Sequence, residues 1–202
     1  MSGSTLRQLA TAATMIILAA CSVGDQVAPT ARPTVNKALL ANGEVMSGFF
    51  SAAPADAPQT TITIKAGSSG VYYFGSHAVY VPANAVCDPA TSGYGPSLWQ
   101  APCTTLTTDF QVTVKYWTNA QGYPLVEFSP DIRFHPNRSA WLYLNEPGGA
   151  QQSTSAILYC PTGSTTCTNE SATDSALQTW RDPNSGWLWR MVRHFSGYNV
   201  WA

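Results

Sequence analysis

The sequence predicts an all-β protein, an antiparallel β-sandwich with two loops that are each closed by a disulfide. From about residue 60 onward, short runs of alternating apolar and polar residues follow one another, separated by Gly, Pro, Asn and Asp. No stretch of a dozen residues repeats its apolar positions with the 3.6-residue period of a helix. Four cysteines in the same region fall into two close pairs, and these predict the disulfides.

The expected strands lie in a single domain that spans residues 60–202. The run at 110–117 is the clearest, because every second residue from Phe110 to Tyr116 is apolar or aromatic and the residues between them are mostly polar. The other expected strands are residues 61–65, 71–74, 77–81, 125–128, 132–134, 141–144, 156–159, 177–180, 187–192 and 198–201. Ser129-Pro130-Asp131 is expected to form a turn in which the aspartate caps the backbone.

Residues 1–20 are predicted to be the signal peptide of a bacterial lipoprotein. Arg7 precedes an apolar stretch at 9–20, which is shorter than the roughly 20 residues that a membrane-spanning helix needs. Leu18-Ala19-Ala20-Cys21 resembles a lipobox, in which the thiol of Cys21 accepts a diacylglycerol. A buried helix that happens to contain a cysteine is the alternative. Because Ser22 is not an aspartate, the resemblance implies sorting to the outer membrane if the host is diderm.

Residues 21–59 are predicted to be a flexible tether between the lipid anchor and the domain. Prolines and small residues dominate this segment, for example in the stretch at 51–58, and such a composition has little apolar surface to bury. Residues 38–50 are more apolar and are expected to form a small element docked on the domain.

An even number of cysteines in an exported chain favours two disulfides. Of the three possible connectivities, we expect the local one, Cys87–Cys103 and Cys160–Cys167, because both intervening loops are rich in turn residues. A four-cysteine metal site is the rival interpretation, but the chain has no Cys-x-x-Cys spacing, so no metal is expected.

Three segments, taken in order, resemble ZU5 domains, which are β-sandwich modules of ankyrins, netrin receptors and bacterial surface proteins. The segment at 75–85 is similar to the family's Val/Ile-Pro-small-Gly-Ala motif, with Asn84 in place of the glycine. The segment at 128–134 is similar to its Pro-Asp/Glu-x-x-Phe motif, and His194-Phe195-Ser196 to its closing strand. The insertion between Cys87 and Cys103 departs from the family pattern.

In some ZU5-containing proteins the bond between the phenylalanine and the serine of this triplet cleaves itself. The resemblance implies an N-to-O acyl shift, in which the Ser196 hydroxyl attacks the Phe195 carbonyl and His194 takes the proton. The alternative is purely structural: Phe195 is a core residue, and His194 and Ser196 are hydrogen-bonded on the opposite face of the strand.

Two groups of aromatic residues are candidates for a binding surface. Trp187 and Trp189 share one face of an expected strand, where they are either core or a platform on which sugar rings or a partner protein stack. Tyr94 and Trp99 lie inside the loop between Cys87 and Cys103, which we expect to be too short to bury both.

Composition excludes several function classes. Charged residues make up only 10% of the chain and the net charge is −1, so clustered cations for nucleic acid are lacking. The histidines have no metal-ligand spacing, and there is no phosphate loop and no Gly-x-Ser-x-Gly elbow, so no cofactor and no catalysis are expected. The leading hypothesis is a lipid-anchored cell-envelope protein that presents an interaction or structural module to an envelope protein or a glycan. Self-cleavage and carbohydrate binding are the alternatives.

Overall fold

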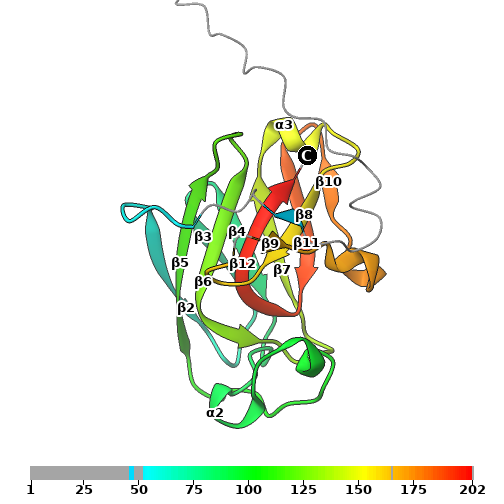
Figure 1. Ribbon diagram of the computed structural model, residues 1–202. Coiled ribbons are helices and arrows are strands. Elements are labelled where there is room, and N and C mark those ends of the chain that lie inside the picture. The colour runs from blue at the N-terminus through cyan, green and yellow to red at the C-terminus, as the bar shows by residue number, and fades with distance from the viewer. Residues whose placement is uncertain (1–45, 48–51, 165, 202) are drawn as a thin grey trace, which may run out of the picture. The chain divides into compact units, whose positions relative to one another are not determined.

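The computed structural model describes residues 46–47, 52–164 and 166–201, and its two five-stranded antiparallel sheets pack as a sandwich (Figure 1). The predicted fold class is therefore confirmed. The strands of the first sheet are, in spatial order, β10 (Trp180–Asp182), β11 (Trp187–Val192), β7 (Ala140–Asn145), β4 (His77–Val81) and β3 (Gly70–Phe74). Those of the second sheet are β2 (Gln59–Ile64), β5 (Phe110–Thr118), β6 (Pro124–Arg133), β12 (His194–Trp201) and β8 (Ala156–Cys160).

The remaining elements are short and lie outside the two sheets. A two-residue pairing joins β1 (Met46–Ser47) to β9 (Thr166–Cys167). The helical turns are α2 (Pro89–Ser92), α3 (Pro147–Ala150) and the 3-10 helices η1 (Pro96–Leu98), η2 (Glu170–Ala172) and η3 (Ser175–Leu177). Pro stands at the first position of α2, α3 and η1, where its fixed φ suits a helix start and its missing N–H costs nothing.

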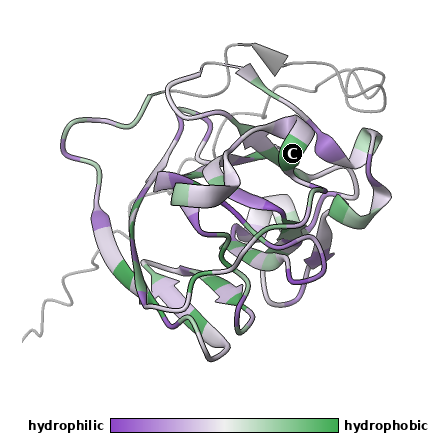
Figure 2. Cartoon of the chain, turned by 90° about the horizontal axis from the view of Figure 1, so that it is seen from below, coloured by the Kyte–Doolittle hydropathy of each residue, from purple (hydrophilic) through white to green (hydrophobic). Residues whose placement is uncertain are grey.

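The core lies between the sheets, and alternation along the strands fills it. In β11, Leu188, Arg190 and Val192 are buried, whereas Trp187 and Trp189 are half-buried on the outer side. Apolar and polar residues accordingly intersperse along the strands in Figure 2. Strand β12 is the exception, because all of its residues are buried. It is an inner strand of its sheet, between β6 and β8, and is also covered on its outer side, so it has no face left for solvent.

Two expected strand boundaries are wrong. The expected strand at 177–180 begins only at Trp180, because the Asp174 carboxylate accepts the Ala176 N–H and so caps the 3-10 helix η3. The expected strands at 125–128 and 132–134 are parts of a single strand, β6, whose pairing with β12 is irregular around the cis Ser129–Pro130 bond.

The ordered domain begins before residue 60. Residues 46–47 form β1, within the segment expected to dock, and Ala53 and Ala57 pack against a small cluster on the outer side of the second sheet. Part of the predicted tether therefore belongs to the sandwich. The predicted signal peptide and Cys21 lie outside the described residues. In the part of the chain that the structure describes, no helix is long and apolar enough to span a membrane.

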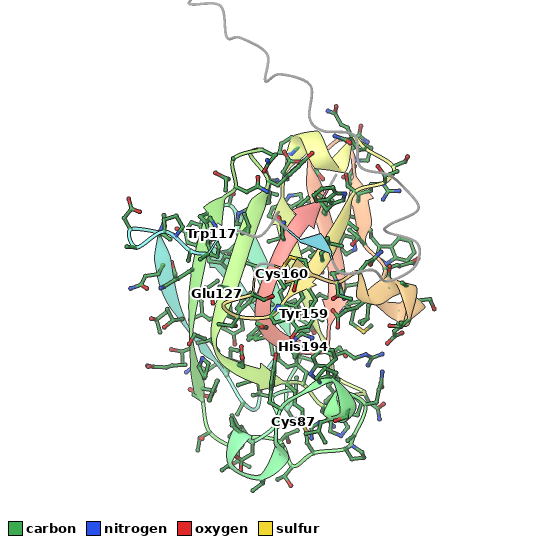
Figure 3. The ribbon with its side chains drawn as sticks, viewed as in Figure 1. Cys87, Trp117, Glu127, Tyr159, Cys160 and His194 are labelled. Atoms are coloured by element: carbon green, nitrogen blue, oxygen red, sulfur yellow. A yellow bond between two sulfur atoms is a disulfide. The ribbon has the colours of Figure 1, made fainter. Side chains whose placement is uncertain are left out.

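Both expected disulfides are confirmed, Cys87–Cys103 and Cys160–Cys167. Each closes a loop, and both loops reach the start of β12 (Figure 3). Residues 88–102 contribute Tyr94, which contacts Phe195, and residues 161–166 contribute Thr162, which contacts Ser196. The two bridges thus hold loop residues around the triplet that the sequence analysis singled out.

Candidate functional site

The outer face of the first sheet carries a continuous set of aromatic side chains. Because alternate residues of a strand point to opposite faces, Trp187 and Trp189 of β11 share this face with Tyr143 of β7. The same pattern places Tyr80 of β4 and Tyr73 of β3 there. The sequence analysis named the two tryptophans, and the sheet joins them to tyrosines that lie more than forty positions away in the chain.

One cross-strand row runs through the middle of this face. Register pairs Trp180 with Trp189, Trp189 with Tyr143, Tyr143 with Ala78, and Ala78 with Tyr73. With strands about 4.8 Å apart, the row extends about 19 Å across the sheet. The Tyr143 and Trp189 rings are stacked, with centroids 6.5 Å apart and planes 20° apart. Ala78 is the one small residue in the row, so the face is hollowed between Tyr143 and Tyr73.

The hollow is part of a groove with a volume of about 480 Å³. Its walls are mostly apolar, and Asp182 and Ser185 lie at one end. Tyr73 is 70% exposed and Trp180 49% exposed, which is unusual for large aromatic side chains. A mostly apolar groove with a few polar groups is the usual form of a small-molecule site.

The loop between Cys87 and Cys103 exposes only one of its two aromatic residues. Trp99 is only 8% exposed and stacks on His194, with ring centroids 3.8 Å apart. The Tyr94 ring is 36% exposed, but its hydroxyl points inward. The loop thus does not bury both side chains, but it buries Trp99, which cannot serve as a contact surface because the loop folds against the end of the sandwich.

Arg133, at the end of β6, explains how this loop is held. Its side chain is buried and donates hydrogen bonds to carbonyl oxygens along the loop, at 2.7–3.3 Å. The acceptors are the carbonyl oxygens of Ser92, Gly93, Leu98, Ala101 and Pro102. One guanidinium thus donates to five backbone carbonyl groups of the loop, with its Nε–H shared between two of them. No sequence pattern pointed to this residue.

His194, at the start of β12, is fully buried in a network of polar groups. Its Nε2 lies 3.3 Å from Glu170 Oε1, and Glu170 Oε2 accepts a hydrogen bond of 2.7 Å from Arg190. Burial lowers the pKa of His194, so the ring is neutral at neutral pH. Burial alone raises the pKa of Glu170, but the hydrogen bond from His194 and the charge of Arg190 outweigh it, and the net pKa is lowered. The neutral ring therefore donates from Nε2 to an ionised carboxylate.

The other ring nitrogen of His194 faces two tyrosines. Nδ1 lies 3.2 Å from the Tyr94 hydroxyl and 3.3 Å from that of Tyr198. Among the hydrogen bonds of the described residues, none joins His194 to the Ser196 hydroxyl. Phe195 points into the core and stacks on Phe128, as the structural alternative expects.

The Phe195–Ser196 peptide has its own hydrogen bonds. The Tyr94 hydroxyl donates to the Phe195 carbonyl oxygen at 3.0 Å. Ser196 Oγ accepts the Thr162 N–H at 3.1 Å and lies 3.1 Å from the Thr162 hydroxyl, which in turn donates to Asp131 at 3.0 Å. Burial, followed by the charge of Asp131, holds the pKa of Tyr94 well above its usual range. Tyr94 therefore keeps its proton and stays a donor.

The fold and the groove define the class of this protein as a disulfide-bonded β-sandwich with an open aromatic face. Searches for similar proteins identify no relative: no family model, no curated protein and no solved structure matches the chain. Its function must therefore be argued from its own residues.

Proposed function

We propose that the protein is a lipid-anchored, ZU5-like module of the cell envelope that binds carbohydrate in the aromatic groove. The observation that carries the proposal is the row of aromatic residues across the first sheet, with a hollow at Ala78. The lipid anchor at Cys21 rests on the resemblance of residues 18–21 to a lipobox. The two disulfides support an oxidising, exported location.

Sugar rings suit this groove because both combine apolar faces with polar groups at an edge. The C–H faces of a pyranose are apolar and stack on aromatic rings, while its hydroxyl groups point outward from the ring edge. Tyr143 and Tyr73 stand two strand spacings apart, about 9.6 Å, with Ala78 between them. Two van der Waals contacts of about 3.5–4.0 Å leave room for one ring in that space. The tyrosine hydroxyls and the Asp182 carboxylate then offer hydrogen bonds at the ring edge.

The test is a titration of intrinsic tryptophan fluorescence with cellohexaose and chitohexaose, two β-1,4-linked oligosaccharides. Tyr73→Ala is expected to weaken binding about tenfold, equivalent to about 1.4 kcal/mol. Because Tyr73 is 70% exposed, its removal leaves the core intact. Thr63→Ala, on the exposed side of β2 in the other sheet, is the matched control. If neither sugar changes the fluorescence, or if Tyr73→Ala binds as the wild type does, carbohydrate binding is refuted.

The lipid anchor has a separate test. The mature wild-type protein, expressed in a bacterium that processes lipoproteins, is expected in the membrane fraction with the mass of an acylated Cys21. Cys21→Ala is expected to be unmodified and to leave that fraction. An unmodified wild-type protein would refute the anchor without affecting the groove.

We propose self-cleavage at Phe195–Ser196 as a second candidate function. The hydrogen bond from Tyr94 to the Phe195 carbonyl oxygen favours it, because a donor at that oxygen stabilises the oxyanion that forms when a nucleophile attacks. The test is the intact mass of the denatured protein beside a Ser196→Ala control. Loss of the peptide from Ser196 onward in the wild type alone would support cleavage, and one uncleaved species in both would refute it.

A further inference from the structure

We propose that Thr162 and Asp131, rather than His194, accept the Ser196 proton in this self-cleavage. The inference rests on self-cleavage as proposed above. It assigns the proton-accepting role to a chain of side chains that the sequence analysis did not connect: Ser196 on β12, Thr162 in the loop closed by Cys160–Cys167, and Asp131 on β6.

Counting donors and acceptors fixes the direction of this chain. Thr162 has one hydroxyl hydrogen, and it is donated to Asp131 Oδ1 at 3.0 Å. An ionised carboxylate only accepts hydrogen bonds. In the 3.1 Å contact between the Thr162 and Ser196 hydroxyls, Ser196 is therefore the donor. The Thr162 hydroxyl therefore links the Ser196 hydroxyl, which also interacts with Tyr94 and Tyr159, to the Asp131 carboxylate.

The irregular pairing of β6 brings Asp131 to this position. Phe195 pairs with Ile132 and Gly197 with Glu127, so residues 128–131 lie opposite Ser196 alone. Phe128 and Ser129 stay paired with β5, and Asp131 is exposed at the end of this irregular stretch. The disulfide loop supplies the middle member of the chain, since both the N–H and the hydroxyl of Thr162 contact Ser196 Oγ.

The surroundings of His194 leave it out of this path. Its Nε2 faces Glu170, and its Nδ1 faces Tyr94 and Tyr198. Asp131, by contrast, has access to solvent, so a proton that reaches it is not trapped in the core.

The step balances without any further reactant except water. Ser196 Oγ bonds to the Phe195 carbonyl carbon as its proton passes to Thr162 and the Thr162 proton passes to Asp131. The oxyanion is held by the Tyr94 hydroxyl. The bond from the Phe195 carbon to the Ser196 nitrogen then breaks, and that nitrogen regains the proton through the same chain. The resulting ester is hydrolysed by water to the Phe195 carboxylic acid and the Ser196 hydroxyl.

A cavity of about 210 Å³ is large enough to hold water. Tyr94 and Asp131 line it, together with Ile132, the strand partner of Phe195. The groups that hold the oxyanion and accept the proton thus border a space that can supply the hydrolytic water.

The experiment follows cleavage of the full chain after cell-free synthesis under oxidising conditions, by mass spectrometry of the denatured product over time. Thr162→Val keeps the side-chain shape and the N–H but removes the hydroxyl, and Asp131→Asn removes the base. Each is expected to slow cleavage about 100-fold or more. Thr162→Ser and Asp131→Glu are expected to restore it in part. Thr63→Val and Asp109→Asn, both on exposed side chains away from the bond, are the matched controls.

A further readout separates chemistry from folding. Hydroxylamine is expected to trap the ester as the Phe195 hydroxamate in the wild type, and much less in Thr162→Val. If Asp131→Asn cleaves at the wild-type rate, this inference is overturned while self-cleavage stands. If the wild type never cleaves, both are overturned.

Discussion

The contribution of the buried ion pair between Arg190 and Glu170 to stability can be tested by removing one of its two charges. The Arg190 side chain is fully buried and that of Glu170 is 9% exposed, with 2.7 Å between their charged atoms. We expect Glu170→Gln to lower the free energy of unfolding by about 3–5 kcal/mol, because it leaves the guanidinium charge buried without a counter-charge. The remaining bonds of Arg190, to the carbonyl oxygens of Ile157 and Met191, do not neutralise it.

An exposed ion pair provides the matched control. Lys65 and Asp109 are 2.5 Å apart but 59% and 46% exposed, so Asp109→Asn is expected to lower the free energy of unfolding far less than Glu170→Gln does. The assay is urea denaturation at pH 7, followed by tryptophan fluorescence. A second variant, Glu170→Gln with Arg190→Met, is expected to be more stable than Glu170→Gln alone because it removes the orphaned charge. Equal losses of unfolding free energy in Glu170→Gln and Asp109→Asn would refute the idea that burial makes the unpaired charge costly.

Three further outcomes are expected. His77 is buried and its pKa is lowered to about 4, so its contribution to stability is complete above pH 6.5 and is lost as the pH falls toward 4. Between pH 6.5 and 5 the wild type should therefore lose about 2 kcal/mol in urea denaturation that His77→Asn does not lose. Arg133→Met is expected to speed amide hydrogen exchange across residues 88–102 while leaving that of the strands unchanged. Equal exchange rates of residues 88–102 in the wild type and the variant would contradict this. Replacing both Cys160 and Cys167 by Ser is expected to cost about 2 kcal/mol, from the entropy of a short loop, and an unchanged urea midpoint would argue against it.

The sequence was a good guide where structure depends on neighbouring residues. The alternation at 110–117 predicts β5, and the turn residues between paired cysteines predict both disulfides. It was a poor guide where a residue's partner lies far along the chain. Trp99 is buried because Arg133, which lies far along the chain on β6, holds the loop that contains Trp99. No local pattern carries that information.

The candidate groove illustrates the same limit. Trp187 and Trp189 were recognised as a shared face, because a strand's period of two is a local property. Whether that face is core or surface depends on which side of the sheet the second sheet covers, and the row through Ala78 depends on strand order. Likewise, the links from Ser196 to Thr162 and Asp131 exist only once β6, β8 and β12 lie side by side.

The position of β12 also constrains how the chain reaches its folded state. β12 lies between β6 and β8, yet it is the last of these three to leave the ribosome. Until residues 194–201 are available, the second sheet has a gap between β6 and β8, and the facing edges of both strands are unpaired. The nascent chain therefore cannot close its core early. The step that locks the second sheet therefore waits until β12 has been synthesised.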